Sequence, residues 1–136
     1  MQNANVKLIR SSKKNLFTFW LNFLKPYHKL AGREMEALSI LLYYRHELSM
    51  EISNPDLVDK LLFSSDTRAR VRADLGGMKN GVFNNLLTVL RRKKALTRDN
   101  KITPGLIPMM APDDTGFKLI FNFEMNEIEH GRQAEG

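Results

Sequence analysis

Residues 66–102 read DTRARVRADLGGMKNGVFNNLLTVLRRKKALTRDNKI, and this stretch decides the fold class. Gly76 and Gly77 divide it, and glycine commonly ends a helix because it adopts the left-handed conformation without strain. After the glycines, apolar residues recur at helical spacing: Val82, Phe83, Leu86, Leu87 and Leu90. The stretch therefore predicts a helix over 67–75, a glycine turn, and a second helix over 79–94.

Three further helices are predicted before this stretch. The first spans 14–25 and ends at Pro26, because proline cannot continue a helix. The second spans 33–48, where apolar residues again recur at helical spacing. The third begins at Asn54-Pro55, since asparagine is a good N-cap and proline suits the first turn.

The β structure predicted for this chain is small. Residues 96–102 indicate two short extended pieces joined by a turn, and 104–116 form a loop rich in proline and glycine. Apolar residues alternate over 117–124, which predicts a strand, and Val6–Arg10 is a further short candidate. We therefore expect a mainly α fold with a small β element (α+β). It forms a single domain over 1–136, with a basic, aromatic arm and helix over 1–31, a winged-helix-like core over 32–124 and an acidic polar tail over 125–136.

The helix, glycine turn, helix and basic end of 66–102 resemble the winged helix-turn-helix family. The resemblance is carried by Val71, Leu75, Gly76, Gly77, Val82, Phe83, Leu86, Leu87, Leu90 and Leu96. It covers 66–102 closely, and it extends to 33–123 if the flanking elements supply the leading helix and the closing wing strand. The resemblance implies a winged-helix domain that binds double-stranded DNA. The chain also resembles small proteins of crAss-like tailed phages, a resemblance that no particular motif or residue carries.

Charge is distributed in blocks along the chain, whose net charge is +6. Residues 1–33 carry seven basic and no acidic residues, and 65–101 carry ten basic and three acidic residues. The blocks 34–64 and 102–136 each have a net charge of −4. This pattern indicates a polarised surface, which is typical of proteins that contact a polyanion. The alternative is that each basic block is balanced by an acidic neighbour in the fold.

The residue types of the helix over 79–94 suit the major groove of DNA, which admits one α-helix. Asparagine pairs with adenine through two hydrogen bonds, and arginine pairs with guanine or a phosphate. The groove-facing candidates are Lys79, Asn80, Asn84, Asn85, Thr88, Arg91 and Arg92. Phosphate contacts are expected from Arg68, Arg70, Arg72, Arg98 and Lys101. About six such contacts would give a log–log slope of affinity against salt near −5.

The helix over 14–25 is apolar over most of its circumference and must be covered on both sides. Its apolar positions are Leu16, Phe17, Phe19, Trp20, Leu21, Phe23 and Leu24. Burial in the core of the monomer is the commoner outcome for such a helix. The alternative is an interface for a partner or for self-association, as a dimer or a larger assembly, formed by Phe17, Phe19, Trp20 and Phe23.

Several classes of site are not indicated by the sequence. The chain has no cysteine, which excludes disulfides and thiolate metal sites. His28, His46 and His130 lack a second ligand at metal-binding spacing, and there is no phosphate-loop, dinucleotide or nucleophile motif. No apolar run is long enough to span a membrane. We expect a non-enzymatic protein that uses no metal, cofactor or membrane.

Two functions stay open on these grounds. The first is a DNA-binding protein of the cytoplasm, either a transcriptional regulator or a replication or packaging factor. The second is a structural component of a tailed-phage virion, such as a head–tail connector or ring subunit, assembled by contacts with other phage structural proteins. The two differ in what the polar face of 79–94 contacts, which is nucleic acid in the first and protein in the second.

Overall fold

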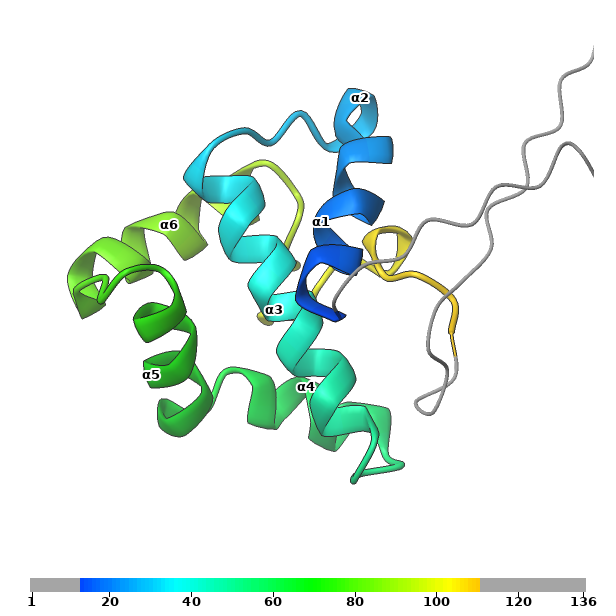
Figure 1. The fold of residues 1–136 in the computed structure, drawn as a ribbon. Coiled ribbons are helices and arrows are strands. Elements are labelled where there is room, and N and C mark those ends of the chain that lie inside the picture. Colours follow the sequence, from blue (N-terminus) through cyan, green and yellow to red (C-terminus); the bar gives the residue numbers. More distant parts are fainter. Residues whose placement is uncertain (1–12, 111–136) are drawn as a thin grey trace, which may run out of the picture.

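The computed structural model describes residues 13–110, which fold into six α-helices and one short 3₁₀ helix. In chain order the elements are α1 (Lys13–Phe23), α2 (Lys25–His28), α3 (Arg33–Ser49), α4 (Pro55–Leu62), α5 (Ser65–Asp74), α6 (Asn80–Arg92) and the 3₁₀ helix η1 (Pro104–Leu106). Figure 1 shows α3 in the middle of the molecule, with α1 along one side and α5 and α6 on the other. None of the described helices is long and apolar enough to cross a membrane.

The core lies around α3, which buries apolar side chains toward both of its neighbours. Five helices contribute to one buried cluster, which includes Phe17, Leu21, Leu38, Leu41, Leu62, Val71, Phe83, Leu87 and Leu90. Burial of a leucine or phenylalanine of this kind stabilises the folded state by roughly 1.5–3 kcal/mol. The N-terminal helix α1 is therefore packed into the same core as the pair α5 and α6.

The starts of α4 and α5 follow from local capping. The helix predicted over 33–48 and the helix predicted to begin after Asn54 are both confirmed. The Asn54 side chain accepts a hydrogen bond from the Asp56 backbone N–H at 3.0 Å. The Ser64 hydroxyl oxygen accepts one from the Thr67 N–H at 3.4 Å, so Ser64 caps α5. Each cap satisfies an N–H group that the helix itself leaves without a partner.

The turn between α5 and α6 uses both of its glycines. Gly76 and Gly77 have φ values of +79° and +80°, where a side chain costs roughly 1–2 kcal/mol. The Arg72 carbonyl accepts hydrogen bonds from the N–H groups of Gly77 and Met78, each at 3.0 Å. The Arg72 guanidinium Nη1 also donates to the Met78 carbonyl oxygen at 3.4 Å. Arg72 therefore holds the turn at both ends.

The predicted wing is wrong, and so is the α+β fold class. The described residues contain no β-strand, only an isolated antiparallel bridge between Leu96 and Ile102. Because Pro104 opens η1 directly after this bridge, the extended pieces are too short to become strands. The fold is mainly α. The strands predicted over 6–10 and 117–124 lie outside the described residues.

Pro26 does not end the first helical region as predicted. α1 ends earlier, at Phe23, and Pro26 lies in the first turn of α2, where its missing N–H is not needed. The His28 Nδ1 accepts a hydrogen bond from the Leu30 N–H at 2.9 Å, so its Nε2 donates to the Leu21 carbonyl oxygen at 2.8 Å. His28 thus connects α2 to α1 and serves the fold.

α1 buries one side and exposes the other. Phe17 is buried in the core, so this member of the predicted interface belongs to the interior. Trp20 is half-buried, and its Nε1–H donates to the Leu106 carbonyl oxygen of η1 at 2.8 Å. Phe19 and Phe23 are 45% and 49% exposed. The core therefore takes one side of α1, and an aromatic surface remains on the other.

Candidate nucleic-acid interface

Helix α6 lies at the edge of the molecule (Figure 1) and buries only one side, formed by Phe83, Leu87 and Leu90. Helical geometry arranges its other positions in three rows. These are a polar flank (Asn84, Thr88, Arg91), an outer row (Gly81, Asn85, Arg92) and an apolar flank (Val82, Leu86, Val89). No acidic residue occurs in α6. The helix therefore presents polar and basic groups without a carboxylate of its own.

The polar flank of α6 is connected to α5 through Arg68. The Arg68 guanidinium donates a hydrogen bond to the Asn84 side-chain oxygen. The same guanidinium lies over the Phe83 ring, 5.5 Å from its centroid. Because Asn84 is uncharged, its hydrogen bond does not neutralise the positive charge of Arg68 beside the exposed surface of α6.

The polar flank is also connected to the loop over 97–101. Arg91 donates to the Asn100 side-chain oxygen at 2.6 Å and to the Thr88 hydroxyl oxygen at 3.2 Å. Asn100 has φ +61°, a left-handed conformation that asparagine tolerates better than most residues. This role of Asn100 was not predicted, although the Asp-Asn pair was the signal for a turn. Predicted binding residues of α5 and α6 thus lie together, and the loop joins them through Asn100.

The outer row of α6 carries the groups with the fewest contacts. Asn85 is exposed and forms no hydrogen bond with the described residues. Arg92 is exposed and has no ion pair within the described part of the chain, and its charge, with that of Lys93, helps to lower the pKa of Glu34. Gly81 is also exposed, and a Cβ at this position would meet no atom within 4 Å. Asn85 and Arg92 are therefore available to an outside ligand.

The apolar flank of α6 lines a shallow groove of about 450 Å³ beside the α5–α6 turn. Val82 is 53% exposed, whereas Leu86 and Val89 are half-buried. Leu75 and Met78 of the turn form the opposite wall of the groove. An exposed valine next to polar and basic groups was not predicted, because the sequence pattern assigned Val82 to the core.

The N-terminal end of α6 is open. Lys79 is the N-cap residue but makes no side-chain cap hydrogen bond, and both Lys79 and Asn80 are exposed. The first turn contains no acidic residue. The backbone N–H groups of a helix N-terminus and its partial positive charge favour an anion. The predicted positions of Lys79 and Asn80 at this end are compatible with a phosphate contact.

Two of the predicted phosphate ligands are engaged within the fold. Arg72 holds the turn before α6, and its Nε is buried. The Lys101 ammonium lies 3.7 Å from a carboxylate oxygen of Asp56 and 3.9 Å from one of Asp99. The Thr97 hydroxyl donates to Asp99 and holds the pKa of that carboxyl below its usual value. Arg98 is exposed in the same loop and forms no ion pair with the described residues.

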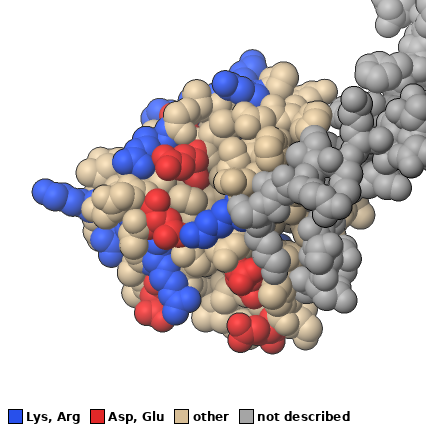
Figure 2. All heavy atoms as spheres, in the orientation of Figure 1, with Lys and Arg blue, Asp and Glu red and all other residues tan. Residues whose placement is uncertain are grey.

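Acidic side chains around α6 are also held in place. The Lys93 ammonium, just after α6, lies 2.7 Å from a Glu34 carboxylate oxygen of α3, and its hydrogen bond lowers the pKa of Glu34. On the face shown in Figure 2, Lys and Arg side chains project from the side where α5 and α6 lie, with acidic side chains among them. The basic blocks are thus partly balanced by neighbours, and exposed cations remain both beside α6 and on α2.

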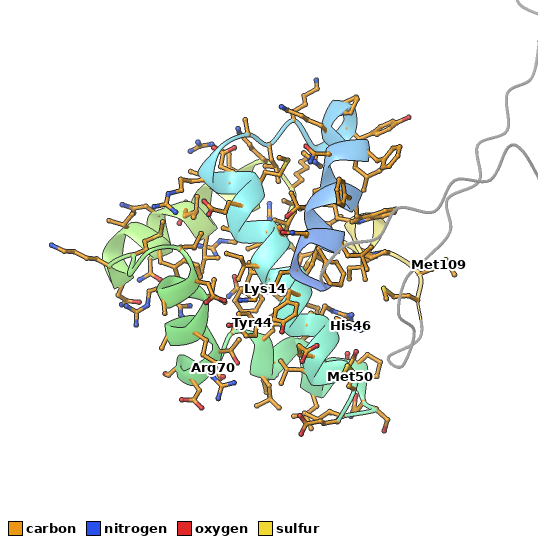
Figure 3. All side chains as sticks on the ribbon, in the orientation of Figure 1. Lys14, Tyr44, His46, Met50, Arg70 and Met109 are labelled. Atoms are coloured by element: carbon orange, nitrogen blue, oxygen red, sulfur yellow. The ribbon has the colours of Figure 1, made fainter. Side chains whose placement is uncertain are left out.

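A separate polar cluster joins α1, α3 and α5. Asp74 accepts hydrogen bonds from the Tyr44 hydroxyl at 2.7 Å and from the Lys14 ammonium at 3.3 Å. Figure 3 shows Lys14 and Tyr44 beside one another, with Arg70 further along α5. Burial, together with the hydrogen bond to Asp74, raises the pKa of Tyr44 to about 12. This cluster fastens α5 to the rest of the fold and leaves the exposed rows of α6 untouched.

The described residues contain no group of three or more histidine, aspartate or glutamate side chains that could hold a metal ion. The exposed side chains of α6 offer hydrogen-bonding, charged and apolar groups. Comparisons with family models, with curated proteins and with solved structures give no match for this chain.

Proposed function

We propose that the protein is a non-enzymatic DNA-binding protein that places α6 in the major groove of a duplex. One observation supports this most strongly: polar groups from α5, α6 and the 97–101 loop converge on a helix that has no acidic residue. α6 has 13 residues, so it is about 20 Å long, and a helix of this kind fits a groove roughly 12 Å wide. Such a protein would serve as a regulator or as a replication or packaging factor, in the cytoplasm.

Five cations are suited to phosphate contacts. Lys79, Arg92 and Arg98 are exposed and form no ion pair with the described residues. Arg68 and Arg91 are hydrogen-bonded to uncharged side chains, which do not neutralise their positive charge. Three to five phosphate contacts give a log–log slope of affinity against salt between about −2.7 and −4.5. This slope is shallower than the value near −5 expected from the sequence, because Arg72 and Lys101 are engaged elsewhere.

The proposal is tested by fluorescence anisotropy of a labelled duplex of mixed sequence, titrated with the full chain over a salt series. We expect binding with the slope given above. Arg92→Ala should weaken binding and make the slope about one unit shallower. The matched control is Lys25→Ala, because Lys25 is exposed on α2, away from α6 in Figure 1. No duplex binding, or equal effects of the two substitutions, contradicts the proposal.

A second candidate function is a structural role in an assembly, such as a tailed-phage virion. It is favoured by a row of exposed aromatic side chains, Phe19, Phe23 and Tyr27, four residues apart on α1 and α2. The same row would support self-association of a DNA-binding protein. Light scattering distinguishes the two: a large ring-sized oligomer indifferent to DNA favours the structural role, and a small oligomer that binds duplex favours the first. Phe19→Ser should reduce the oligomer, whereas Leu57→Ser, at an exposed position on α4, should not.

A further inference from the structure

The two adjacent asparagines of α6 are not equivalent in the structure. Asn84 lies on the polar flank, and its side-chain oxygen is occupied by Arg68. Asn85 lies on the outer row and keeps both its carbonyl oxygen and its amide group available. A base edge approaching α6 from outside would therefore meet Asn85 and not Asn84.

Asn85 has an apolar neighbour on the same exposed surface. Val82 precedes it by three residues, so the two Cβ atoms are roughly 5–6 Å apart. Val82 is 53% exposed, and both residues line the groove beside the α5–α6 turn. Gly81 places no side chain in front of them. A carboxamide and an isopropyl group thus stand side by side on the exposed surface of α6.

This pair of groups matches one kind of base pair. In the major groove, adenine presents the N7 acceptor beside the N6 donor, and a carboxamide satisfies both at once. Thymine presents a methyl group, which an apolar side chain contacts favourably. A G·C pair offers neither this donor–acceptor order on its purine nor a methyl group.

We propose that Asn85 and Val82 make α6 a reader of A·T pairs. Asn85 would bind the N6 and N7 edge of adenine, and Val82 would contact the methyl group of a thymine in the same or an adjacent base pair. This inference rests on the DNA-binding function proposed above. Lys79 at the rim of the same groove favours a polyanion over an apolar protein segment as the occupant.

The test compares the full chain on four duplexes that differ only in their bases, at one fixed salt concentration. They are alternating d(A-T), the same duplex with uracil for thymine, the same duplex with 7-deazaadenine for adenine, and alternating d(G-C). Uracil lacks only the methyl group, and 7-deazaadenine lacks only the N7 acceptor, so both leave the phosphates and the minor groove unchanged. We expect d(A-T) to bind roughly 5- to 150-fold more tightly than d(G-C). Uracil should weaken binding about fourfold, which is the effect of one methyl group removed from water.

Substitutions assign the preference to its two residues. Asn85→Ala should remove the sensitivity to 7-deazaadenine, and Val82→Ala should remove the sensitivity to uracil. Asn22→Ala on α1 is the matched control, because Asn22 is exposed on the other side of α3 and should keep both sensitivities.

The outcomes separate this inference from the function on which it rests. Equal, salt-dependent binding of all four duplexes overturns the A·T preference and leaves DNA binding standing. A preference for d(A-T) that ignores uracil and 7-deazaadenine points to the minor groove, and it overturns the roles of both residues. Absence of binding to every duplex refutes the proposed function, and the A·T preference with it.

Discussion

Replacement of Gly81 by glutamate should stabilise the fold and weaken DNA binding at the same time. Gly81 is exposed in the first turn of α6, and a Cβ at this position would meet no atom within 4 Å. A glycine in a helix costs about 0.8–1 kcal/mol relative to a good helix former. A carboxylate near the positive end of the helix contributes about 0.3–1 kcal/mol. The free energy of unfolding should therefore rise by about 1–2 kcal/mol, which raises Tm by roughly 4–8 °C.

The same carboxylate has the opposite effect on a DNA complex. It would stand on the outer row of α6, four residues before Asn85, where phosphates and base-edge acceptors approach. It would displace a phosphate from the helix end, and a hydrogen bond to a charged group is worth about 1.5–3 kcal/mol. Since about 1.4 kcal/mol corresponds to a factor of ten, Kd should rise by at least about tenfold.

Thermal unfolding by circular dichroism and duplex binding by anisotropy measure the two effects independently. Gly105→Glu is the matched control, because Gly105 is exposed in η1 beside α1, and a Cβ at this position would also meet no atom within 4 Å. It adds the same charge and should leave Kd unchanged. If Gly81→Glu raises Tm and binds DNA as the parent does, then the start of α6 does not face DNA. A lower Tm would refute the calculation for the helix.

Three further predictions concern the fold itself. Leu41→Ala, at a fully buried position of α3, should lower the free energy of unfolding by about 2–5 kcal/mol. Leu57→Ala, at an exposed position, should change it by about 0.5 kcal/mol or less, and urea denaturation measures both changes. Gly77→Ala should lower the free energy of unfolding by roughly 1–2 kcal/mol, because alanine is strained at the positive φ of this turn. Since a Cβ there meets no atom within 4 Å, an unchanged Tm would contradict this explanation. Because the pKa of Tyr44 rises from 10.0 to about 12, the folded state favours the neutral phenol. The contribution of Tyr44 to the free energy of unfolding is therefore full below pH 10 and is lost as the pH rises toward 12. Tyrosinate absorbance and denaturation over that range should show this loss, and Tyr44→Phe should abolish it.

The parts of the fold that were predicted correctly depend on signals within a few residues. Asn54 and Pro55 are a cap and a first-turn residue in any context, so the start of α4 was predictable. Gly76 and Gly77 needed only their freedom at positive φ, so the turn before α6 was also predictable.

The parts that were predicted wrongly depend on the space around them. Proline is excluded from a helix only where its N–H is needed, and Pro26 lies in the first turn of α2, where that N–H has no helical partner. The predicted wing needed several paired residues on each side of the turn. Among the described residues only Leu96 and Ile102 form a bridge, and the chain enters η1 at Pro104, two residues after it.

The candidate site shows the same division. Spacing alone places both Asn84 and Asn85 on exposed positions of a helix and assigns Val82 to the core. Only the position of Arg68 on the neighbouring helix distinguishes the two asparagines. Val82 is 53% exposed in the groove beside the turn, and periodicity along one helix does not report how neighbouring segments cover it.

Arg72 connects the fold to the site more directly than a phosphate contact would. Its carbonyl accepts two N–H groups of the turn, and its guanidinium donates to the Met78 carbonyl oxygen. Both interactions fix where the chain leaves the glycines, and therefore where α6 begins. The outer row is the side opposite Phe83, Leu87 and Leu90, and a shift of the chain by one residue relative to that buried side would rotate the helix by about 100°. Under such a shift Asn84 would replace Asn85 beneath an approaching base, so the availability of Asn85 depends on a residue that does not itself face the ligand.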